Sequence, residues 1–279
     1  MGFGEVGEQL RRSTVQVRSA DSRGQGIGSG VVWSSDGTIV TNAHVAAAGE
    51  FRVELWDGSS FPAKVAERDP VRDLAILKIR ASGLPAATFR FSPMRAGEIV
   101  IAAGNPLGFT GALSTGVAHA SGAIGGLGRG QWVQAAVRLA PGNSGGPLAD
   151  ASGAVVGINT MVVSGGLALA IPAVSVAEFI RNGCAPRLGV ALRPVRLESN
   201  RFGLLIMEVE TASAAERSSL FAGDILLGTK DAAFRDAGDL GDAIAAAGSG
   251  CLTLRFLRGD RARERRATVS FTEARRAAA

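Results

Sequence analysis

Short runs rich in valine, isoleucine and leucine recur over the first 171 residues, each bounded by glycine, serine or aspartate. Each run has the length of a β-strand, and several alternate apolar with polar side chains, as a strand with one buried face requires. Asp36-Gly37 and Asp57-Gly58 supply hairpin signals between runs. The pattern predicts an all-β sandwich or a pair of β-barrels. The runs are STVQVRS, GSGVVWSSDGTIVTN, FRVELWDGSSFPAKVAERD, LAILKIR, EIVIAAG and GAVVGINTMVV.

The pattern changes at residue 171, where the segment IPAVSVAEFIRNG has apolar residues at helical spacing and ends on Gly183. We expect a helix here, with Val174, Val176, Ala177 and Ile180 at that spacing, to close a first domain. Strand-like runs return in GLLIMEVE, DILLGTK and CLTLRFLR, with one helix-like segment, AGDLGDAIAAAG. About 85 residues in that order indicate a small, separate α+β domain. The predicted boundaries are 1–183, a linker at 184–187, a second domain at 188–272 and a basic tail at 273–279.

The formal net charge of +5 comes largely from arginines late in the chain, in the segments LRGDRARERRATV and EARRAAA. We interpret these as a solvated hairpin and tail. A nucleic-acid surface would interleave aromatic residues with the charges, and none are present, so we expect no nucleic-acid partner.

Targeting, membrane and metal signals are absent from the sequence. No basic start precedes an unbroken apolar run in the first thirty residues, which predicts a cytoplasmic protein or one whose leader is missing. The uncharged stretch Ile99–Gly128 holds eight glycines and Pro106, so we expect buried strands and turns there and no membrane span. Cys184 and Cys251 have no histidine or cysteine neighbours at metal spacing, so we expect no metal and no cofactor. Two free, partly buried thiols are favoured over a disulfide bridge between them.

The segment APGNSGGPL has the residues that acyl transfer by a serine requires. Such chemistry needs an exposed hydroxyl, a base to accept its proton and backbone donors aimed at the oxyanion. Gly142 and the residues beside Ser144 are able to form a strained turn that directs N–H groups inward, while Gly145 and Gly146 let a substrate backbone approach closely. We therefore consider Ser144 a candidate nucleophile.

Two histidines and two aspartates compete for the other roles. His44 lies where an apolar strand gives way to a loop, whereas His119 has no carboxylate within many residues, so His44 is the favoured base. Asp73 directly precedes the apolar strand LAILKI and is the favoured orienting carboxylate. Asp69, its competitor, suits a turn before Pro70. The order His, Asp, Ser is that of chymotrypsin-like enzymes.

The motifs TNAHV, DLAIL, GNPLG and GNSGGPL, in this order, resemble the HtrA/Deg family of serine proteases. The resemblance implies two six-stranded β-barrels with His44 as base, Asp73 as orienting carboxylate and Ser144 as nucleophile between them. It implies an oxyanion hole formed by the N–H groups of Gly142 and Ser144. It also implies an endopeptidase that cuts unfolded or misfolded polypeptides, and a family that is usually periplasmic or otherwise extracytoplasmic.

The same resemblance implies a homotrimer joined through the N-terminal segment. Phe3, Val6 and Leu10 are apolar in a region with little else to bury them. They fit such an interface, but they equally fit docking onto the barrel.

The second domain resembles a PDZ module, which binds an extended C-terminal peptide as an added strand. The resemblance places the terminal carboxylate on the backbone N–H groups of Leu188, Gly189 and Val190. Ser219 and Ala222 stand where the family usually has glycine and proline. Those departures leave the peptide preference open.

Asn143 bears on how the oxyanion turn is ordered. Digestive trypsin-like enzymes have an aspartate there that pairs with a newly freed N-terminus, and a neutral side chain makes no such ion pair. Activation by cleavage is therefore not expected. The family resemblance suggests instead that loops order the turn, here the glycine-rich segments SGAIGGLGRG and VSGGLALAIP.

The sequence leaves two alternatives for the pocket that binds the side chain preceding the cleaved bond. In trypsin-like folds the residue six before the nucleophile lies at the base of the pocket for the side chain preceding the cut, which here is Arg138. An unpaired arginine in that pocket would favour an acidic side chain. Alternatively, Arg138 turns outward, and Leu139 with the segment Leu167–Ala170, including Ala168 and Leu169, lines an ordinary apolar pocket.

A non-catalytic chaperone or peptide-binding scaffold is the competing functional class. Ala136 keeps it open, because the family usually has an aspartate in the segment that leads to the nucleophile. The intact His44, Asp73 and Ser144 argue against it.

Overall fold

The computed structural model describes residues 2–21, 24–124, 130–163, 166–184, 186–197, 200–248 and 250–271. It divides into two compact units, Met1–Cys184 and Ala185–Ala279. Each unit is described by itself below.

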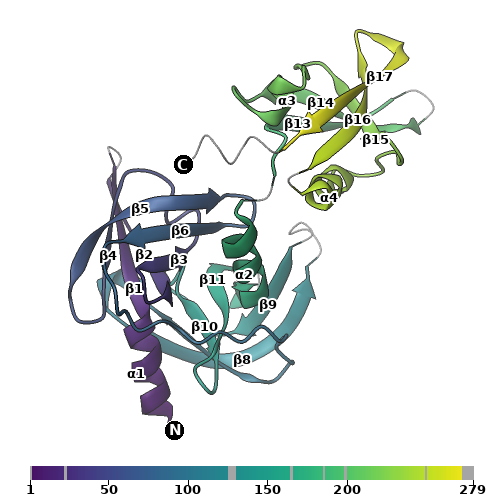
Figure 1. Ribbon diagram of the computed structural model, residues 1–279. Helices are drawn as coiled ribbons and strands as arrows, with labels where there is room; N and C mark the ends of the chain where they lie inside the picture. The colour runs from purple at the N-terminus through teal and green to yellow at the C-terminus, as the bar shows by residue number, and fades with distance from the viewer. Residues whose placement is uncertain are drawn as a thin grey trace. The chain divides into compact units, whose positions relative to one another are not determined.

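The first half of unit 1 is a closed six-stranded barrel of mostly consecutive antiparallel strands (Figure 1). The Asp-Gly hairpins are confirmed, since Gly37 (φ 88°) lies between β2 and β3 and Gly58 (φ 84°) between β4 and β5. Alternate side chains such as Val15, Val17 and Leu77 fill the interior. The strands are β1 (Thr14–Asp21), β2 (Gly24–Ser34), β3 (Thr38–Thr41), β4 (Glu50–Glu54), β5 (Ser60–Asp69) and β6 (Leu74–Ile79), in the order β1-β2-β3-β6-β5-β4.

The second half of unit 1 is another closed barrel, so the expectation of a chymotrypsin-like double barrel is confirmed. The described part of the uncharged stretch Ile99–Gly128 forms strands, as expected, together with a short 3-10 helix. Its first strand is buried apart from Ile99, but its second strand is mostly exposed, which corrects the expectation of buried strands throughout. The elements are β7 (Ile99–Gly104), η1 (Pro106–Gly108), β8 (Ala112–Ala123), β9 (Gln131–Ala136), β10 (Pro147–Asp150), β11 (Val155–Val162) and β12 (Ala168–Pro172), in the barrel order β10-β11-β12-β9-β8-β7.

Helix α2 (Ala173–Asn182) follows the second barrel and ends at Gly183, whose φ of 73° stops the helix as predicted. The buried face differs from the predicted one. Ala173, Val176 and Phe179 are buried, whereas Val174 is 42% exposed. Residues at intervals of three from Ala173 lie on the helix face that packs against the barrel, and Val174 lies outside that face.

Helix α1 (Phe3–Ser13) was not foreseen as a helix. It lies along the second barrel, and Val6 and Leu10 pack against Ile101 and Ala103 of β7. Two of the three apolar residues of this segment are therefore buried by ordinary docking, which leaves Phe3 exposed.

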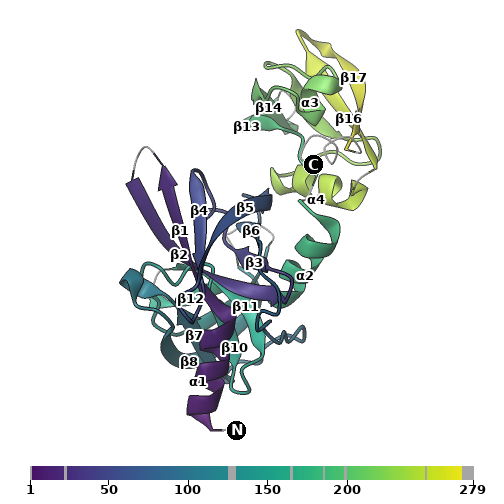
Figure 2. The same ribbon diagram turned by 60° about the vertical axis from the view of Figure 1, so that its left-hand side comes forward.

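Unit 2 is a five-stranded antiparallel sheet with two helices, which confirms a small α+β fold after the barrels (Figure 2). Leu240 of α4 packs on a core formed mainly by the sheet, including Leu204 and Phe256. The elements are β13 (Val190–Arg196), β14 (Phe202–Val209), α3 (Ala214–Arg217), β15 (Ile225–Thr229), α4 (Gly238–Ala247), β16 (Cys251–Arg258) and β17 (Asp260–Ser270), with the strands in sequential order.

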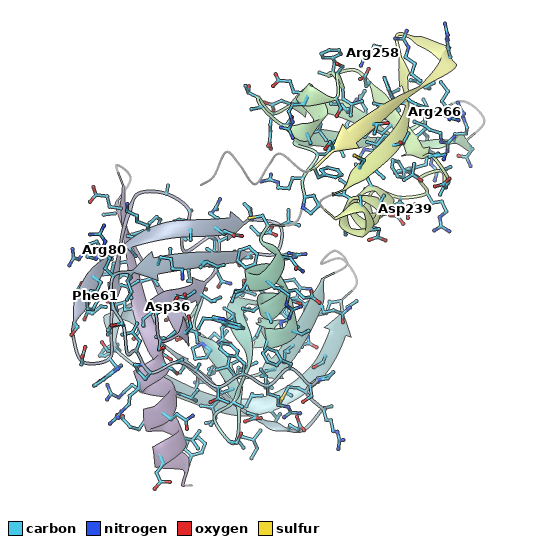
Figure 3. All side chains as sticks on the ribbon, in the orientation of Figure 1. Asp36, Phe61, Arg80, Asp239, Arg258 and Arg266 are labelled. Carbon is cyan, nitrogen blue, oxygen red and sulfur yellow. The ribbon has the colours of Figure 1, made fainter. Side chains whose placement is uncertain are left out.

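Charged residues on the β16–β17 hairpin have two different environments (Figure 3). Arg258 donates both Nε and Nη2 to the buried Asp224 carboxylate at 2.7 Å and lies over the Phe221 ring. Arg266 is exposed on β17. Arg258 thus has a structural role within unit 2, whereas Arg266 is exposed to solvent.

Both cysteines are exposed, which corrects the expectation of partly buried thiols. Cys184 follows the last turn of α2 at the end of unit 1, and Cys251 opens a strand, so neither faces a core. Over the described residues, no helix is long and apolar enough to span a membrane, and no cluster of three potential metal ligands occurs.

Candidate active site

Three loops bring the predicted triad residues from both barrels. His44 follows β3 and Asp73 immediately precedes β6, two neighbouring strands of the first barrel. Ser144 lies in the turn before β10 of the second barrel. Asp73 has a φ of 54°, a strained value for a residue other than glycine.

The Asp73 carboxylate is the centre of a hydrogen-bond network. Its Oδ2 lies 2.9 Å from His44 Nδ1, and its Oδ1 accepts the His44 backbone N–H at 3.0 Å. Thr160 donates its hydroxyl to Oδ2 at 2.5 Å. Asn42 donates its side-chain amide to the Asp73 carbonyl at 2.9 Å, which fixes the backbone. With a carboxylate at Nδ1, that nitrogen carries the proton and Nε2 is left as the acceptor.

Asp73 stays ionised despite its burial. Desolvation alone would raise its pKa, but the hydrogen bonds from His44 and Thr160 outweigh burial and leave the pKa below its ordinary value. The carboxylate is therefore charged at neutral pH and stabilises a proton on the half-exposed His44 ring.

Thr160 is a site residue that the sequence reasoning missed. It is buried in β11 and contributes its hydroxyl to Asp73 and its carbonyl to Ser144, whose Oγ donates to it at 3.0 Å. The only signal in the sequence was a polar residue within the apolar run GINTMVV. That signal does not identify a partner 87 positions away.

The turn that carries Ser144 is held from several sides. The Asn143 N–H donates to the Ala140 carbonyl at 3.0 Å, and Gly142 has a φ of 103°. Proline and then positive-φ glycine at the two central positions are the features of a type II turn. A Cβ on Gly142 would lie 2.6 Å from the Asn105 carbonyl, so only glycine fits.

Ser29 is a second residue that the sequence did not reveal. Its hydroxyl donates to the Gly142 carbonyl at 2.6 Å, and its backbone N–H donates to the Ser144 carbonyl at 2.8 Å. It also accepts the Asn105 N–H at 2.8 Å. A buried residue of the first barrel thus anchors both flanks of the turn in the second.

The turn leaves two donors and one hydroxyl for chemistry. Within the described part of the chain, the N–H groups of Gly142 and Ser144 have no hydrogen-bond partner. The Ser144 hydroxyl is bonded to the Thr160 carbonyl rather than to His44. Transfer of its proton to His44 therefore requires a rotation about the Ser144 side chain.

The competing candidates have structural roles. His119 is exposed on β8, where its Nδ1 lies 3.3 Å from the Gln134 side chain. Asp69 accepts the backbone N–H groups of Val71 and Arg72 at 3.0 and 3.2 Å, as a turn-forming residue does.

The residues considered for the substrate pocket have mixed environments. Arg138 is exposed, and its backbone carbonyl accepts the Ser114 hydroxyl at 2.5 Å. Leu139 and Leu167 are partly buried, while Ala168 and Leu169 are buried in the second barrel. Residues 125–129 and 164–165 of the two glycine-rich loops lie outside the described residues.

The predicted carboxylate loop of unit 2 precedes β13. Leu188 is buried, and its carbonyl accepts the Ala215 N–H at 2.8 Å. Gly189 has a φ of 75°, and its carbonyl accepts the Glu210 N–H at 2.9 Å. Val190 opens β13 and is partly buried.

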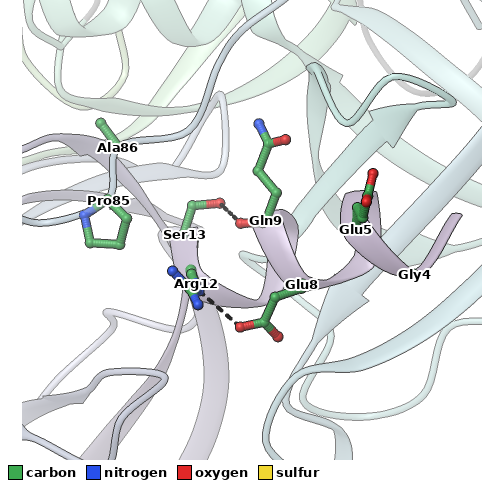
Figure 4. Close-up of a pocket in the computed structure, with 8 residues that line it drawn as sticks. All are labelled: Gly4, Glu5, Glu8, Gln9, Arg12, Ser13, Pro85 and Ala86. Carbon is green, nitrogen blue, oxygen red and sulfur yellow. Dashed lines mark hydrogen bonds and ion pairs between the residues drawn. The ribbon is translucent and has the colours of Figure 1, made fainter. Parts of the chain in front are cut away.

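A surface pocket beside α1 contains none of these residues (Figure 4). It is lined by residues of α1 and by Pro85 and Ala86. Two of its charged residues, Glu8 and Arg12, form an ion pair at 2.8 Å, and Glu8 also accepts from Arg11 at 2.7 Å. This pocket is therefore unrelated to the triad.

Comparison with known proteins finds serine proteases. Residues 28–158 match the family model of the trypsin-like peptidase domain. A probable periplasmic serine endoprotease, DegP-like, of Chlamydia trachomatis is 36% identical over 228 residues, covering 72% of this chain and 45% of that protein. The putative serine protease HhoB of Synechocystis is 38% identical over 237 residues, covering 74% and 57%. The chain thus spans about half the length of these curated relatives.

Solved structures match nearly the whole chain. The HtrA-type protease AlgW with a decapeptide has a TM-score of 0.70 at 25% identity and covers 97% of this chain and 98% of that one. AlgW with a tripeptide has a TM-score of 0.67 at 28% identity and covers 97% and 96%. Both units of this chain therefore have counterparts in those structures.

Proposed function

This chain belongs to the HtrA/Deg family of trypsin-like serine proteases, and we propose that it is a serine endopeptidase acting through Ser144, His44 and Asp73. The observation that carries the proposal is the network in which ionised Asp73 binds both His44 and Thr160, while Thr160 also contacts Ser144. A protein that only bound peptides would have no use for a carboxylate held against an imidazole beside a strained glycine turn.

The proposed reaction forms and breaks one acyl-enzyme ester. Ser144 Oγ attacks the scissile carbonyl carbon while His44 Nε2 takes the hydroxyl proton. The Gly142 and Ser144 N–H groups receive the developing oxyanion. The tetrahedral adduct collapses as His44 returns the proton to the leaving amine. Water then attacks the ester by the same steps, which releases the carboxylic acid and restores Ser144.

The free edge of β11 supports an extended polypeptide substrate. β10 pairs with β11 only as far as Ile158, whereas Met161 and Val162 are exposed and pair with β12 alone. A substrate strand added along Thr160–Val162 would place its main chain beside Ser144. A folded protein rarely offers such a free strand, so this edge favours unfolded or misfolded substrates.

Entry of that strand would also release the nucleophile. A substrate N–H that donates to the Thr160 carbonyl competes with the Ser144 hydroxyl for the same acceptor. The displaced hydroxyl would then be available to His44.

Labelling tests the proposed activity directly. A fluorophosphonate probe should modify Ser144 with loss of fluoride, and the protein should degrade unfolded casein. A non-catalytic scaffold would bind casein without either reaction.

We propose that unit 2 is a PDZ domain and that it binds peptide C-termini. The positive φ of Gly189 and the hydrogen bonds that the Leu188 and Gly189 carbonyls accept within the unit support a loop that offers N–H groups to a carboxylate. The periplasmic relatives make an extracytoplasmic location the favoured one.

Cleavage preference is proposed to be for small apolar side chains. Arg138 is exposed, which supports the outward alternative over a buried guanidinium in the pocket. In a peptide library, valine, alanine or leucine should precede the cut in both the wild type and Arg138→Ala. Enrichment of aspartate or glutamate in the wild type, lost in Arg138→Ala, would contradict this.

Assembly into a homotrimer is proposed to use the surface around α1. Phe3 is 54% exposed at the start of the helix, and Ile99 and Val117 form an exposed cross-strand pair on β7 and β8. Leu113 of β8 is exposed beside Gly7 of α1. Such a patch is unlike the scattered apolar residues of an ordinary monomer surface.

Phe3→Asp should convert a trimer to monomers in light scattering, because it buries a charge in the proposed interface without touching Val6 or Leu10. Phe221→Asp, at a site of similar exposure (53%) in unit 2, is the control and should leave the mass unchanged. Deletion of residues 1–10 is a poorer test, because it would also uncover Ile101. An unchanged mass for Phe3→Asp would remove this surface from the assembly.

A further inference from the structure

The strand β13 is an edge of the unit 2 sheet, and its outward backbone groups follow from two hydrogen bonds (Figures 1 and 2). The Gly189 carbonyl accepts the Glu210 N–H at 2.9 Å, on the side of β14. Because a peptide unit is planar and trans, the Val190 N–H of the same unit points the opposite way, toward the free edge.

At the C-terminal end of β13, backbone groups also point alternately toward β14 and toward the free edge. The Leu197 N–H donates to the Arg201 carbonyl at 2.9 Å, again across the β13–β14 hairpin. The Arg196 carbonyl in that peptide unit therefore points to the free edge. The bulge in this pair leaves Met207 of β14 unmatched and does not interrupt β13. Backbone groups of Val190, Leu192, residue 194 and Arg196 thus line the free edge.

Residue 194 is proline, which has no N–H. The free edge therefore offers the N–H groups of Val190 and Leu192 and then a gap. Proline is tolerated within a sheet where its nitrogen faces away from the partner strand, and Pro194 meets that condition here.

The loop that leads into β13 is suited to bind an anion at the free edge. The Leu188 and Gly189 carbonyls are both bound inside the unit, so the Gly189 and Val190 N–H groups point outward together. Arg187 lies beside this loop, where its guanidinium is 3.5 Å from the Glu210 carboxylate. A peptide whose carboxylate sits here would run antiparallel to β13, with its last residue at Val190 and its third-from-last at Leu192.

Apolar side chains accompany those two positions. Val190 and Leu192 are partly buried and pack against the core of unit 2, as do Ile244 and Ala247 of α4. Pro194 is exposed and is not part of that core. The unbroken run of N–H donors and the apolar side chains that accompany it thus both end at Leu192.

We propose that unit 2 recognises only the last three residues of a free C-terminus, because Pro194 ends the strand ladder opposite the fifth-from-last residue. This inference rests on the proposed peptide-binding function and adds its length limit. Recognition of so short a tail suits a partner whose C-terminus is exposed by misfolding or cleavage, since little extended chain is needed.

The test compares peptides of three and eight residues that share the same last three residues and end in valine. Binding is titrated with the full chain carrying Ser144→Ala, so that the peptides are not cut. The two lengths should bind with affinities within about twofold. Pro194 keeps its carbonyl as an acceptor, but its ring replaces the N–H and keeps an added strand from following the edge beyond Leu192. Adding Pro194→Ala restores an N–H and should strengthen the eight-residue peptide by about 2- to 12-fold, with the three-residue peptide unchanged.

Arg193→Ala is the matched control, because Arg193 is exposed and its backbone faces β14. It should not create a length dependence. Hydrogen exchange supplies a readout that needs no change at Pro194: the eight-residue peptide should protect the Val190 and Leu192 amides and leave the Arg196 amide unprotected.

Two possible results would contradict the proposal in different ways. An eight-residue peptide that binds tenfold tighter than the three-residue one, with Arg196 protected, would overturn the length limit and leave peptide binding intact. Equal binding of free and amidated peptides, or no binding of either length, would overturn the carboxylate loop and the length limit together.

Discussion

Ser144→Ala is expected to lower peptide hydrolysis by roughly 10⁶-fold, the effect of removing the nucleophile from an enzyme of this design. The loss is large because alanine supplies no atom to form the acyl ester, and His44 and Asp73 then have no proton to move. His44→Ala should cost a similar factor, and the double variant little more, because residues that act as a unit are not additive.

The measurement is kcat/KM on a fluorogenic peptide together with fluorophosphonate labelling. Ser144→Ala should show no labelling and keep its thermal unfolding temperature, because the hydroxyl contributes one hydrogen bond, to the Thr160 carbonyl. Ser152→Ala is the control, since Ser152 is an exposed serine whose hydroxyl caps the Asp150 turn. Wild-type activity in Ser144→Ala would show that the assignment is wrong.

The same pair of proteins separates an enzyme from a scaffold. If Ser144→Ala still binds casein while the wild type both binds and cuts it, hydrolysis depends on Ser144 and binding does not. A wild type that binds casein and neither cuts it nor reacts with the probe would instead favour the non-catalytic alternative that Ala136 left open.

Features set by local sequence could be predicted. The strand runs, the Asp-Gly hairpins and the helix stop at Gly183 follow from alternation, turn chemistry and positive φ within a few residues. His44 and Asp73 were predicted as triad residues because each lies where a strand meets a loop. These positions constrain the local chain whatever packs against it.

Features set by packing between distant segments could not be predicted. Ser29 binds the Gly142 carbonyl 113 positions away, and Thr160 binds Asp73 87 positions away, and no local pattern marks either serine or threonine. Helix α1 was missed because Gly4 and Gly7 lower its helix propensity, and docking on the barrel compensates for that cost.

Asp73→Asn is expected to lower kcat by about 10⁴-fold while the fold is retained. The asparagine amide has one N–H₂ group and one carbonyl where the carboxylate had two acceptors. In the wild type, the Asp73 carboxylate accepts hydrogen bonds from His44 Nδ1, from the His44 backbone N–H and from the Thr160 hydroxyl. Turning the amide group toward His44 forces the proton onto Nε2, so the ring no longer accepts the proton of Ser144.

The pKa of Asp73 sets the direction of the accompanying pH effect. Its folded-state pKa is lowered, so its charged contacts stabilise the fold above the unfolded-state pKa and are lost as the pH falls through the folded one. Asp73→Asn removes that titration, and its stability should fall less steeply on acidification than that of the wild type. Chemical denaturation from neutral to acid pH measures the difference.

Asp69→Asn is the matched control, because Asp69 is a buried carboxylate close to Asp73 in the chain and accepts the Val71 and Arg72 N–H groups. An asparagine oxygen still accepts the Val71 and Arg72 N–H groups, so kcat should stay near the wild-type value. If the two variants lose activity equally, the loss at Asp73 reflects distortion of the loop. If Asp73→Asn alone loses it, and Thr160→Val loses part of it, then the carboxylate acts through the orientation and charge of His44.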